Sequence, residues 1–474
     1  MNDKAYGTFL DTIKTRALIK PGARVLAALS GGSDSVVMLH MLTRIRDEYS
    51  LTLEAAHINH MIRPTAGRDE RFCRELCERW GVPLHIRRID VPALSREKKI
   101  GLEECGRRVR YEAFEEIMAA RSLRLCATAH NRDDNAETMI LNFVRGASAR
   151  GMSGIPFVRG ALIRPILDIK KADVLSYAKS HGLAFVTDET NADTSYTRNF
   201  VRGELMPLIE RMNPSFADAA ARSAALFSRD EAYLAAEAKR ALSRGEDFTS
   251  YIKFPLEYLR TLPEAVLSRV VRLSCVRVCG AEPDFTATER AMSAIYEKSG
   301  NYAETLIGGA ALECAYGGAY FIREIKPESF AVSVDKDEDT LYFPAAGLKI
   351  SYKVENYSIN FKKFNGILYM DYDIMTSEAF FTERKEGDVF EPFGGAGKRS
   401  VKRFMQDNRI PSFLRGRLPV LRCGGDILWV CPVMRPARKA AVTKDTKRVI
   451  CFRVSKTDEN NTSDKGAFFN AQGS

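Results

Sequence analysis

The segment from Val25 to Ser35 constrains the fold of this chain more than any other part of its sequence. It reads VLAALSGGSDS and is followed by a helical pattern of apolar residues. A short apolar run of this kind is typical of a buried strand, and two glycines let the chain turn sharply into a helix. The N–H groups of such a turn and the positive end of the helix favour an anion. The segment therefore predicts a phosphate-binding loop at the end of a strand in an α/β domain.

The side chains of this loop indicate what accompanies the phosphate. Its serine hydroxyls can donate to phosphate oxygens, but the carboxylate of Asp34 would repel them, which indicates a Mg²⁺ ion between the two. The loop is no Walker A motif, and the similar run Gly394–Lys398 fails because residue 392 is proline and Arg399 follows the lysine. A structural turn capped by serine is the alternative interpretation. The predicted phosphate-binding residues are Ser30, Gly31, Gly32, Ser33, Asp34 and Ser35.

Strand and helix patterns alternate along roughly the first 210 residues, as expected for a parallel sheet with helices on both faces. The predicted strands are Val25–Leu29, Leu53–Ile58, Leu84–Ile89, Leu125–Ala129 and Leu162–Leu167. The predicted helices are Ser33–Tyr49, Arg68–Trp80, Glu103–Ala120, Asp134–Val144 and Lys171–His181. This order indicates a doubly wound α/β fold, in which ligands bind beyond the carboxyl ends of the strands.

The rest of the chain, which has 474 residues and is too long for a single core, changes pattern twice. Helical patterns, the first of them Ala-rich, occur at Ser215–Leu242, Leu256–Cys279 and Ala287–Lys298, and short β-type runs follow at Leu341–Phe343 and Leu348–Val354. We expect a catalytic α/β domain (1–212), a small, mostly helical middle domain (213–330) and an α+β C-terminal domain (331–456, core 381–456). The last residues, 457–474, lack periodicity and are predicted to be disordered.

The positive charge of the chain is concentrated near its C-terminus. The net charge is +10, and the segment from Phe381 to Lys456 holds 18 Lys and Arg against 7 Asp and Glu. A concentrated basic module favours a polyanion such as nucleic acid, although a solvated basic surface without a ligand is the alternative.

Ten cysteines and the absence of a long apolar segment indicate a cytoplasmic protein without membrane contact. The cysteines include no CxxC pair, and the spacings Cys73–Cys77 and Cys275–Cys279 fall in helical patterns, where unpaired core thiols are common. The first residues hold no stretch typical of a signal peptide, and no window is apolar enough for a membrane span.

Further motifs resemble one family. The loop SGGSDS resembles that of the PP-loop ATP pyrophosphatases, which cleave ATP between its α and β phosphates and adenylate a carbonyl oxygen. Within this superfamily the chain resembles the tRNA(Ile)-lysidine synthetases. The motifs that carry this resemblance are His57–Arg63, Gly101–Tyr111, Thr128–Thr138, Asn142–Gly146, Asp188–Asn191 with Arg198–Arg202, and Pro207, and then Glu386–Asp388, Ile410–Pro411 and Arg417–Pro419 near the C-terminus.

The resemblance implies an enzyme that uses ATP and Mg²⁺ to join L-lysine to C2 of the wobble cytidine in tRNA(Ile) with a CAU anticodon. An adenylated intermediate, pyrophosphate and AMP would be formed, and the codon read would change from AUG to AUA. Members of the family are often homodimers. The implied catalytic residues are Asp34, Arg110, Asp134, Glu137 and Arg202. The basic residues expected to contact tRNA are Lys398, Arg399, Lys402, Arg403, Arg415 and Arg417.

The chemistry of these side chains agrees with such roles but also allows others. Asp134 and Glu137 are three residues apart on a predicted helix and share a face, so they could hold Mg²⁺ or the ammonium groups of lysine. A solvated acidic helix start is the alternative, and Asp133 could serve in the site or cap the helix. Arg110 and Arg202 could stabilise phosphate charge, or form surface ion pairs.

Some positions depart from the family pattern. Asn131 stands where a second histidine is usual, Asn135 where glutamine is common, and Cys105-Gly106 replace two alanines. His57, His60 and His130 are too few and too poorly spaced for a zinc site, so packing near the nucleotide is the expected role of all three.

A tRNA thiolase with the same loop is the nearest alternative function. It would need a persulfide-bearing cysteine or a CxxC ligand set, whereas Cys126 falls in a predicted strand and Cys105 in a predicted helix. The sequence leaves open the oligomeric state, the residues that hold lysine, the rejection of tRNA(Met) and the role of the middle domain.

Overall fold

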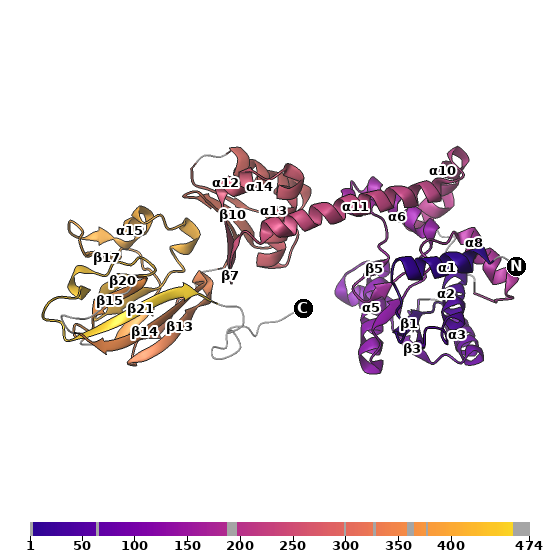
Figure 1. Ribbon diagram of the computed structural model, residues 1–474, viewed down its shortest axis with the longest axis horizontal. Helices are drawn as coiled ribbons and strands as arrows, with labels where there is room; N and C mark the ends of the chain where they lie inside the picture. The colour runs from indigo at the N-terminus through magenta and orange to yellow at the C-terminus, as the bar shows by residue number, and fades with distance from the viewer. Residues whose placement is uncertain are drawn as a thin grey trace. The chain divides into compact units, whose positions relative to one another are not determined.

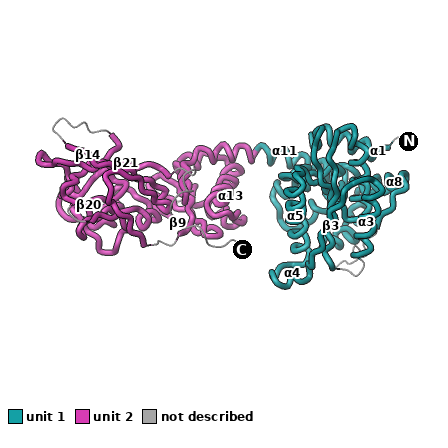
Figure 2. The backbone as a smooth tube through the Cα atoms, turned by 90° about the horizontal axis from the view of Figure 1, so that it is seen from below, with its two compact units in different colours: residues 1–233 teal, residues 234–474 magenta. Residues whose placement is uncertain are grey.

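The computed structural model describes residues 3–62, 66–186, 197–297, 300–325, 329–357, 365–375 and 378–457. The chain forms two compact units, Met1–Tyr233 and Leu234–Ser474 (Figures 1 and 2). The predicted disordered tail from residue 458 onward, the motif residue Arg63 and the motif Asp188–Asn191 lie outside the described residues. Within the described ranges, no helix has the length and apolar character needed to cross a membrane.

The first unit is built on a six-stranded sheet in the order β3-β2-β1-β4-β6-β5 (Figure 1). Neighbouring strands are parallel except for β5, which pairs antiparallel with β6. The strands are β1 Arg24–Ala28, β2 Thr52–Asn59, β3 Leu84–Arg88, β4 Leu125–Ala127, β5 Val158–Arg159 and β6 Leu162–Ile163. The helices are α1 Lys4–Thr15, α2 Ser33–Arg44, α3 Ala66–Trp80, α4 Val91–Lys98, α5 Leu102–Arg121, α6 Arg132–Val144, α7 Ala149–Met152, α8 Lys171–Ser180, α9 Thr197–Phe200, η2 Val201–Leu205 and α10 Met206–Met212. The predicted doubly wound fold is confirmed.

Helices cover both faces of this sheet because successive residues of β1 point to opposite sides. Val25 and Ala27 lie in a core with residues of α1, α2, α3 and α8. Leu26 lies in a second core with Cys126 of β4 and Phe114 of α5. A strand that is buried on both faces shows a continuous apolar run, which is the pattern seen in the sequence. The carboxyl ends of the strands are thus the part of the sheet left open to a ligand.

One strand is shorter than its apolar run predicts. The run Leu162–Leu167 forms a strand only over Leu162–Ile163. Pro165 follows shortly after and has no N–H to donate to a sheet ladder, so the chain leaves the sheet. The first residue beyond β6 is Arg164, which is 3% exposed and donates from Nη1 to the carbonyl of Pro156 at 2.5 Å.

The middle region contains the predicted helices and, in addition, a sheet that its sequence did not predict. The helices are α11 Phe216–Leu242, which spans the boundary between the units, α12 Leu256–Arg260, α13 Glu264–Cys279 and α14 Phe285–Glu297. The sheet has the order β7-β8-β11-β10-β9, with β7 Glu246–Phe248, β8 Tyr251–Pro255, β9 Tyr302–Thr305, β10 Ala310–Ala315 and β11 Gly318–Arg323. Every residue of β10 is buried, so the polar–apolar alternation that reveals a half-exposed strand is absent.

The last part of the second unit consists mainly of two four-stranded antiparallel sheets, β12-β16-β19-β20 and β13-β14-β21-β15. Phe381, Trp429 and Phe452 pack together in its core, with ring centroids 5.1–6.0 Å apart. The strands are β12 Ala331–Ser333, β13 Glu338–Phe343, β14 Leu348–Asn356, β15 Ile367–Asp371, β16 Ala379–Thr382, β17 Val389–Phe390, β18 Arg399–Ser400, β19 Val420–Cys423, β20 Asp426–Val430 and β21 Arg448–Lys456, with helix α15 at Val401–Asp407.

A buried carboxylate joins the middle sheet to this C-terminal part. Glu313 of β10 is 4% exposed, and its two oxygens accept hydrogen bonds from the N–H and hydroxyl of Ser412 and from the N–H of Phe413, at 2.6–3.2 Å. Phe413 also packs with Tyr251 and Tyr320 of the middle sheet. The carboxylate and the aromatic contact together hold two sheets of the second unit in place.

We expect Glu313→Ala to lower the free energy of unfolding of the second unit by about 2–4 kcal/mol. The substitution removes a buried carboxylate and leaves the partly buried donors of Ser412 and Phe413 without their acceptor, and lost hydrogen bonds to a charged group are costly. Urea denaturation measures the loss. Glu338→Ala, at an exposed position of β13, is the control and should change stability by less than about 0.5 kcal/mol. Equal stability of the two variants would contradict the anchoring role.

Candidate active site

The loop between β1 and α2 has the conformation that its two glycines allow. Gly31 has φ +91°, a region that residues with a side chain rarely enter, and Gly32 precedes the first turn of α2. The hydroxyls of Ser30 and Ser35 lie 3.1 Å apart, and Ser35 also donates to the carbonyl of Gly32 at 2.9 Å. These bonds shape the loop from within, so that the start of α2 faces the carboxyl edge of the sheet.

A cavity of about 610 Å³ opens at this edge. That volume is in the range of sites for small molecules and cofactors. The loop residues and side chains from β2, α5 and the segment after β4 all contribute to its wall. Among the lining residues are Ser30, Gly32, Asp34, Ser35, His57, Asn59, Arg110, Tyr111, His130 and Arg198.

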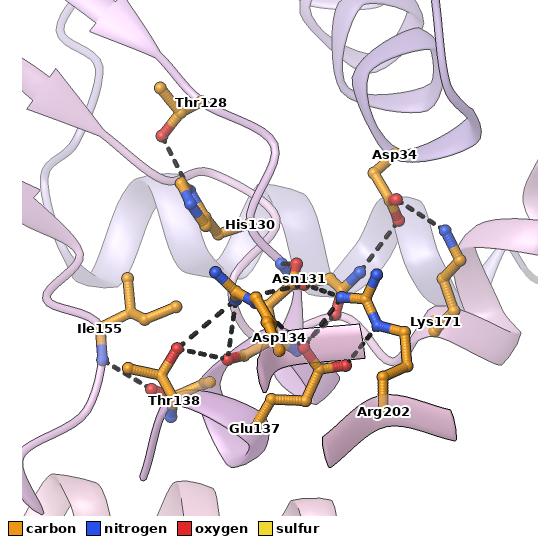
Figure 3. Close-up of polar contacts among 12 residues, drawn as sticks. Asp34, Thr128, His130, Asn131, Asp134, Glu137, Thr138, Ile155, Lys171 and Arg202 are labelled. Carbon is orange, nitrogen blue, oxygen red and sulfur yellow. Dashed lines mark hydrogen bonds and ion pairs between the residues drawn. The ribbon is translucent and has the colours of Figure 1, made fainter. Parts of the chain in front are cut away.

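Two donors from other helices hold the carboxylate of Asp34 (Figure 3). Lys171 of α8 donates from Nζ to Asp34 Oδ2 at 2.6 Å, and Asn131 donates from Nδ2 to Oδ1 at 3.0 Å. In the described part of the chain, no group of three or more His, Cys, Asp or Glu side chains could hold a metal ion. A Mg²⁺ ion that is bound by phosphate oxygens, waters and one carboxylate needs no such group, and Asp34 fits that requirement.

Asn131 and Asn135, two departures from the family pattern, both have structural partners. Asn131 caps α6: its Oδ1 accepts from the N–H of Asp134, and Asp134 Oδ2 accepts from the N–H of Asn131, both at 3.0 Å. Asn135 accepts from the N–H of Ile155 at 2.6 Å. Asparagine is among the best N-cap residues, so the start of α6 and its tie to Asp34 do not require a histidine here.

Asp134 and Glu137 face two arginines rather than open solvent. Arg202 of η2 contacts Glu137 through Nε and Nη2 at 2.6 and 2.9 Å, and Asp134 through Nη2 at 2.8 Å. Arg198 of α9 contacts Glu137 Oε2 from Nε at 3.3 Å. Burial lowers the pKa of Arg202, but its hydrogen bond to Glu137 and the nearby carboxylates outweigh that effect and raise it. Two carboxylates and two guanidiniums thus form a neutral cluster (Figure 3).

Comparison with known proteins identifies the family. A model of the PP-loop domain matches residues 5–209, and a model of the TilS substrate C-terminal domain matches residues 381–450. The tRNA(Ile)-lysidine synthase of Persephonella marina is 29% identical over 452 residues, which cover 94% of this chain and 98% of that protein. The synthases of Nitrosomonas europaea and Clostridium perfringens are each 30% identical, cover 88% and 93% of this chain, and are themselves covered over 89% and 97%. The chain belongs to the tRNA(Ile)-lysidine synthase family.

As a tRNA(Ile)-lysidine synthase by family, the chain is an ATP-dependent ligase that acts in tRNA modification. The resemblance inferred from its motifs is confirmed. The structure brings Asp34, Asp134, Glu137 and Arg202 together in one network, while Arg110 lies on the cavity wall beside His60, with Arg110 Nη2 and His60 Nε2 3.4 Å apart. Their catalytic roles remain predictions.

The basic residues proposed to contact tRNA differ in exposure. Lys398, Lys402 and Arg403 are exposed, as is Arg399, which is paired with Asp407 at 2.8 Å. Arg417, by contrast, is 8% exposed and donates from Nη2 to the carbonyl of Arg323 at 2.9 Å, and burial lowers its pKa. Its guanidinium is therefore committed to the interior of the second unit, and we do not assign it a phosphate. Arg415 is half-buried and donates to the carbonyl of Ile410 and the hydroxyl of Tyr316.

Two site residues were missed in the sequence. Arg198 lies four residues before Arg202, a helical spacing that would have placed both on one face. Lys171 is the first residue of the helix that follows the last parallel strand. A basic residue at this position lies at the carboxyl edge of the sheet, and that placement could have identified it as a site residue. Of the three histidines in the motifs, His57 is buried, with its Nδ1 2.9 Å from the carbonyl of Leu29.

His130 is held neutral by its surroundings. Burial, and then the charges of Arg164, Arg198, Arg107 and Arg110, lower its pKa to about 3. Its Nδ1 lies 3.2 Å from the hydroxyl of Thr128. The ring therefore lines the cavity as an uncharged imidazole near neutral pH, and it can accept or donate one hydrogen bond without changing charge.

The low pKa of His130 predicts how acid affects stability. In the unfolded chain its pKa returns to about 6.5. Below that pH the unfolded state therefore binds more protons than the folded state, and the free energy of unfolding decreases. Stability should therefore fall as the pH is lowered from 7 to 5, and His130→Gln should reduce this fall. Thermal unfolding followed by circular dichroism at both pH values measures the difference. An identical fall in both proteins would contradict the buried, neutral state of the ring.

Proposed function

We propose that this chain activates the wobble cytidine of tRNA(Ile) with ATP and then joins L-lysine to C2 of that base. The observation that carries the proposal is the shared cavity: the phosphate loop, Arg110, His130 and Arg198 line one space at the carboxyl edge of the sheet. Adenylation and ligation need the nucleotide, the base and the amine within reach of one another, and this cavity supplies a common site.

In the first step the C2 carbonyl oxygen of cytidine attacks the α-phosphorus of ATP, and pyrophosphate leaves with the electrons of the broken P–O bond. The residues Ser30–Ser35 hold the phosphates, through backbone N–H groups and the start of α2. Mg²⁺, when bound at Asp34, neutralises phosphate charge. Arg110, which opens onto the cavity, is placed to balance charge on the α-phosphate through its fixed fork of N–H groups.

In the second step the ε-amine of lysine attacks C2, and AMP leaves. The amine must first lose a proton, because an ammonium group has no free electron pair. His130 is a weak base at this site, since its pKa is lowered to about 3. The carboxylates Asp134 and Glu137 are the stronger candidates to hold lysine, with its ammonium group replacing a contact now made by Arg198 or Arg202. One of these carboxylates, or a water molecule, then takes the proton that the ε-ammonium releases before the attack.

The alternative function, tRNA thiolation, is disfavoured by the cysteines. Cys126, in the middle of β4, is fully buried, and burial raises its pKa to about 12. A persulfide donor needs an accessible thiolate of low pKa. Cys105 is buried in α5.

Formation of lysidine is the direct test. Radiolabelled lysine, ATP and a tRNA(Ile) transcript should yield acid-precipitable label that depends on all three components. Asp34→Ala should reduce the label at least about 100-fold, because Mg²⁺ loses the carboxylate that holds it beside the phosphates. Asp11→Ala, an exposed carboxylate on α1, is the control and should keep full activity. Label without tRNA, or turnover retained in Asp34→Ala, would contradict the proposal.

The basic residues near α15 are proposed to bind tRNA phosphates. A deletion from Phe381 onward would remove β19, β20 and β21 and part of the core, so it would not separate binding from folding. We expect the double variant Lys402→Ala/Arg403→Ala to weaken tRNA binding roughly tenfold at 0.1 M salt and to reduce its salt dependence, because fewer counterions are released. Filter binding at several salt concentrations measures both effects. ATP affinity should be unchanged; unchanged tRNA affinity would overturn the assignment.

A further inference from the structure

Lys171 lies at the start of helix α8 and contacts the phosphate loop between β1 and α2. Its Nζ donates to Asp34 Oδ2 at 2.6 Å (Figure 3). The same Nζ also donates to Ser33 Oγ at 2.9 Å. Ser33 and Asp34 are the first two residues of α2, where the N–H groups that would receive phosphate are found. The ammonium group therefore lies beside the first turn of α2, the part of the loop that is expected to receive phosphate.

A second carboxylate fixes the backbone of Lys171. Lys171 is the first residue of α8, and its N–H donates to Asp133 Oδ2 at 2.8 Å. Asp133 lies in the first turn of α6, so it caps α8 from a neighbouring helix rather than its own. From the sequence alone, Asp133 could either act in the site or cap the helix. The structure makes it the residue that ties the start of α8, and with it Lys171, to the active-site edge.

The contacts of Lys171 differ from those of a lysine in a purely structural ion pair. The adjacent Lys170 is an example of such a pair. Lys170 contacts Asp218 at 2.7 Å, and Asp218 also contacts Arg132, away from the phosphate loop. Lys171 instead meets a serine and an aspartate of the loop itself, and 39% of its side chain remains exposed. An exposed pair of this kind contributes at most about 1 kcal/mol to stability, so folding alone gives little reason for it.

We propose that Lys171 is the residue that binds the leaving pyrophosphate, the β and γ phosphates of ATP. This assignment rests on the proposed adenylation, in which the bond between the α-phosphorus and the β-phosphate oxygen breaks. The ammonium group has three N–H donors that can contact phosphate oxygens. In the absence of nucleotide it neutralises Asp34. When phosphates arrive with a cation, Asp34 contacts the cation and Lys171 turns to the phosphate oxygens, where charge grows as pyrophosphate leaves.

Direct competition tests this assignment without requiring the complete reaction. Displacement of a fluorescent ATP analogue by pyrophosphate, in the presence of Mg²⁺, gives the affinity for pyrophosphate in the full-length protein. Lys171→Met should weaken that affinity roughly tenfold or more, the usual effect of losing a hydrogen bond between charged groups. Lys171→Arg should recover part of it, because the positive charge is retained. Lys170→Met, which breaks only the pair with Asp218, is the matched control and should bind pyrophosphate like the wild type.

Competition by AMP separates the phosphate contact from a general disturbance of the loop. AMP carries no β or γ phosphate, so Lys171→Met should bind AMP with unchanged affinity. An equal loss for AMP and pyrophosphate would show that Lys171 shapes the loop only, and unchanged pyrophosphate binding would show that it merely neutralises Asp34; either result overturns the assignment. Failure of the wild type to form lysidine would instead refute the proposed function, while these affinities could still be measured.

Discussion

The active site depends on charge balance among three carboxylates at the carboxyl edge of one sheet. Asp34, Asp134 and Glu137 each accept hydrogen bonds from a cation of another helix: Lys171 of α8, or Arg198 and Arg202 of the α9–η2 segment. Asn131 links the two groups, since it bonds both Asp34 and Asp134. Glu137 is 3% exposed, and a carboxylate so deeply buried without a cation would be costly. The helices that surround the site are thus held in place by ion pairs among the side chains that are proposed to act in catalysis.

The first unit could be predicted from the sequence because its main signals are local. Strands buried on both faces gave continuous apolar runs, and the strand–turn–helix around Gly31 has few other structural uses. The site residues next to these signals, such as Asp34 and Asp134, were found by their motif. Their partners were not, because Lys171 lies 137 residues from Asp34 in the sequence, and the fold alone brings them together.

The second unit was harder to predict for a related reason. In β10 every position is buried, so the strand gives no alternation, and its neighbour β11 begins with Gly318 and Ala319, two residue types that are uncommon in strands. Arg417 shows the same limit for a single residue. Its sequence neighbourhood is basic and suggests a phosphate contact, whereas its side chain lies against Phe413 and donates to a carbonyl of the middle sheet. Charge density along a sequence does not distinguish an arginine at the surface from one that fastens two sheets together.

Under the proposed function, in which lysine binds at Asp134 and Glu137, the neutral cluster has a consequence for how lysine is selected. An ammonium group entering beside Asp134 and Glu137 does not meet bare carboxylates, because Arg198 and Arg202 already satisfy them. Lysine must therefore exchange with a guanidinium, and the exchange keeps the number of positive charges at the carboxylates constant. A neutral amine or a small cation without the lysine stem would lose the arginine contacts and gain little in return. The displaced arginine is then free to turn toward the cavity that Arg198 lines, where the adenylate phosphate carries negative charge. Binding of lysine and stabilisation of the phosphate are coupled by this exchange of one cation for another.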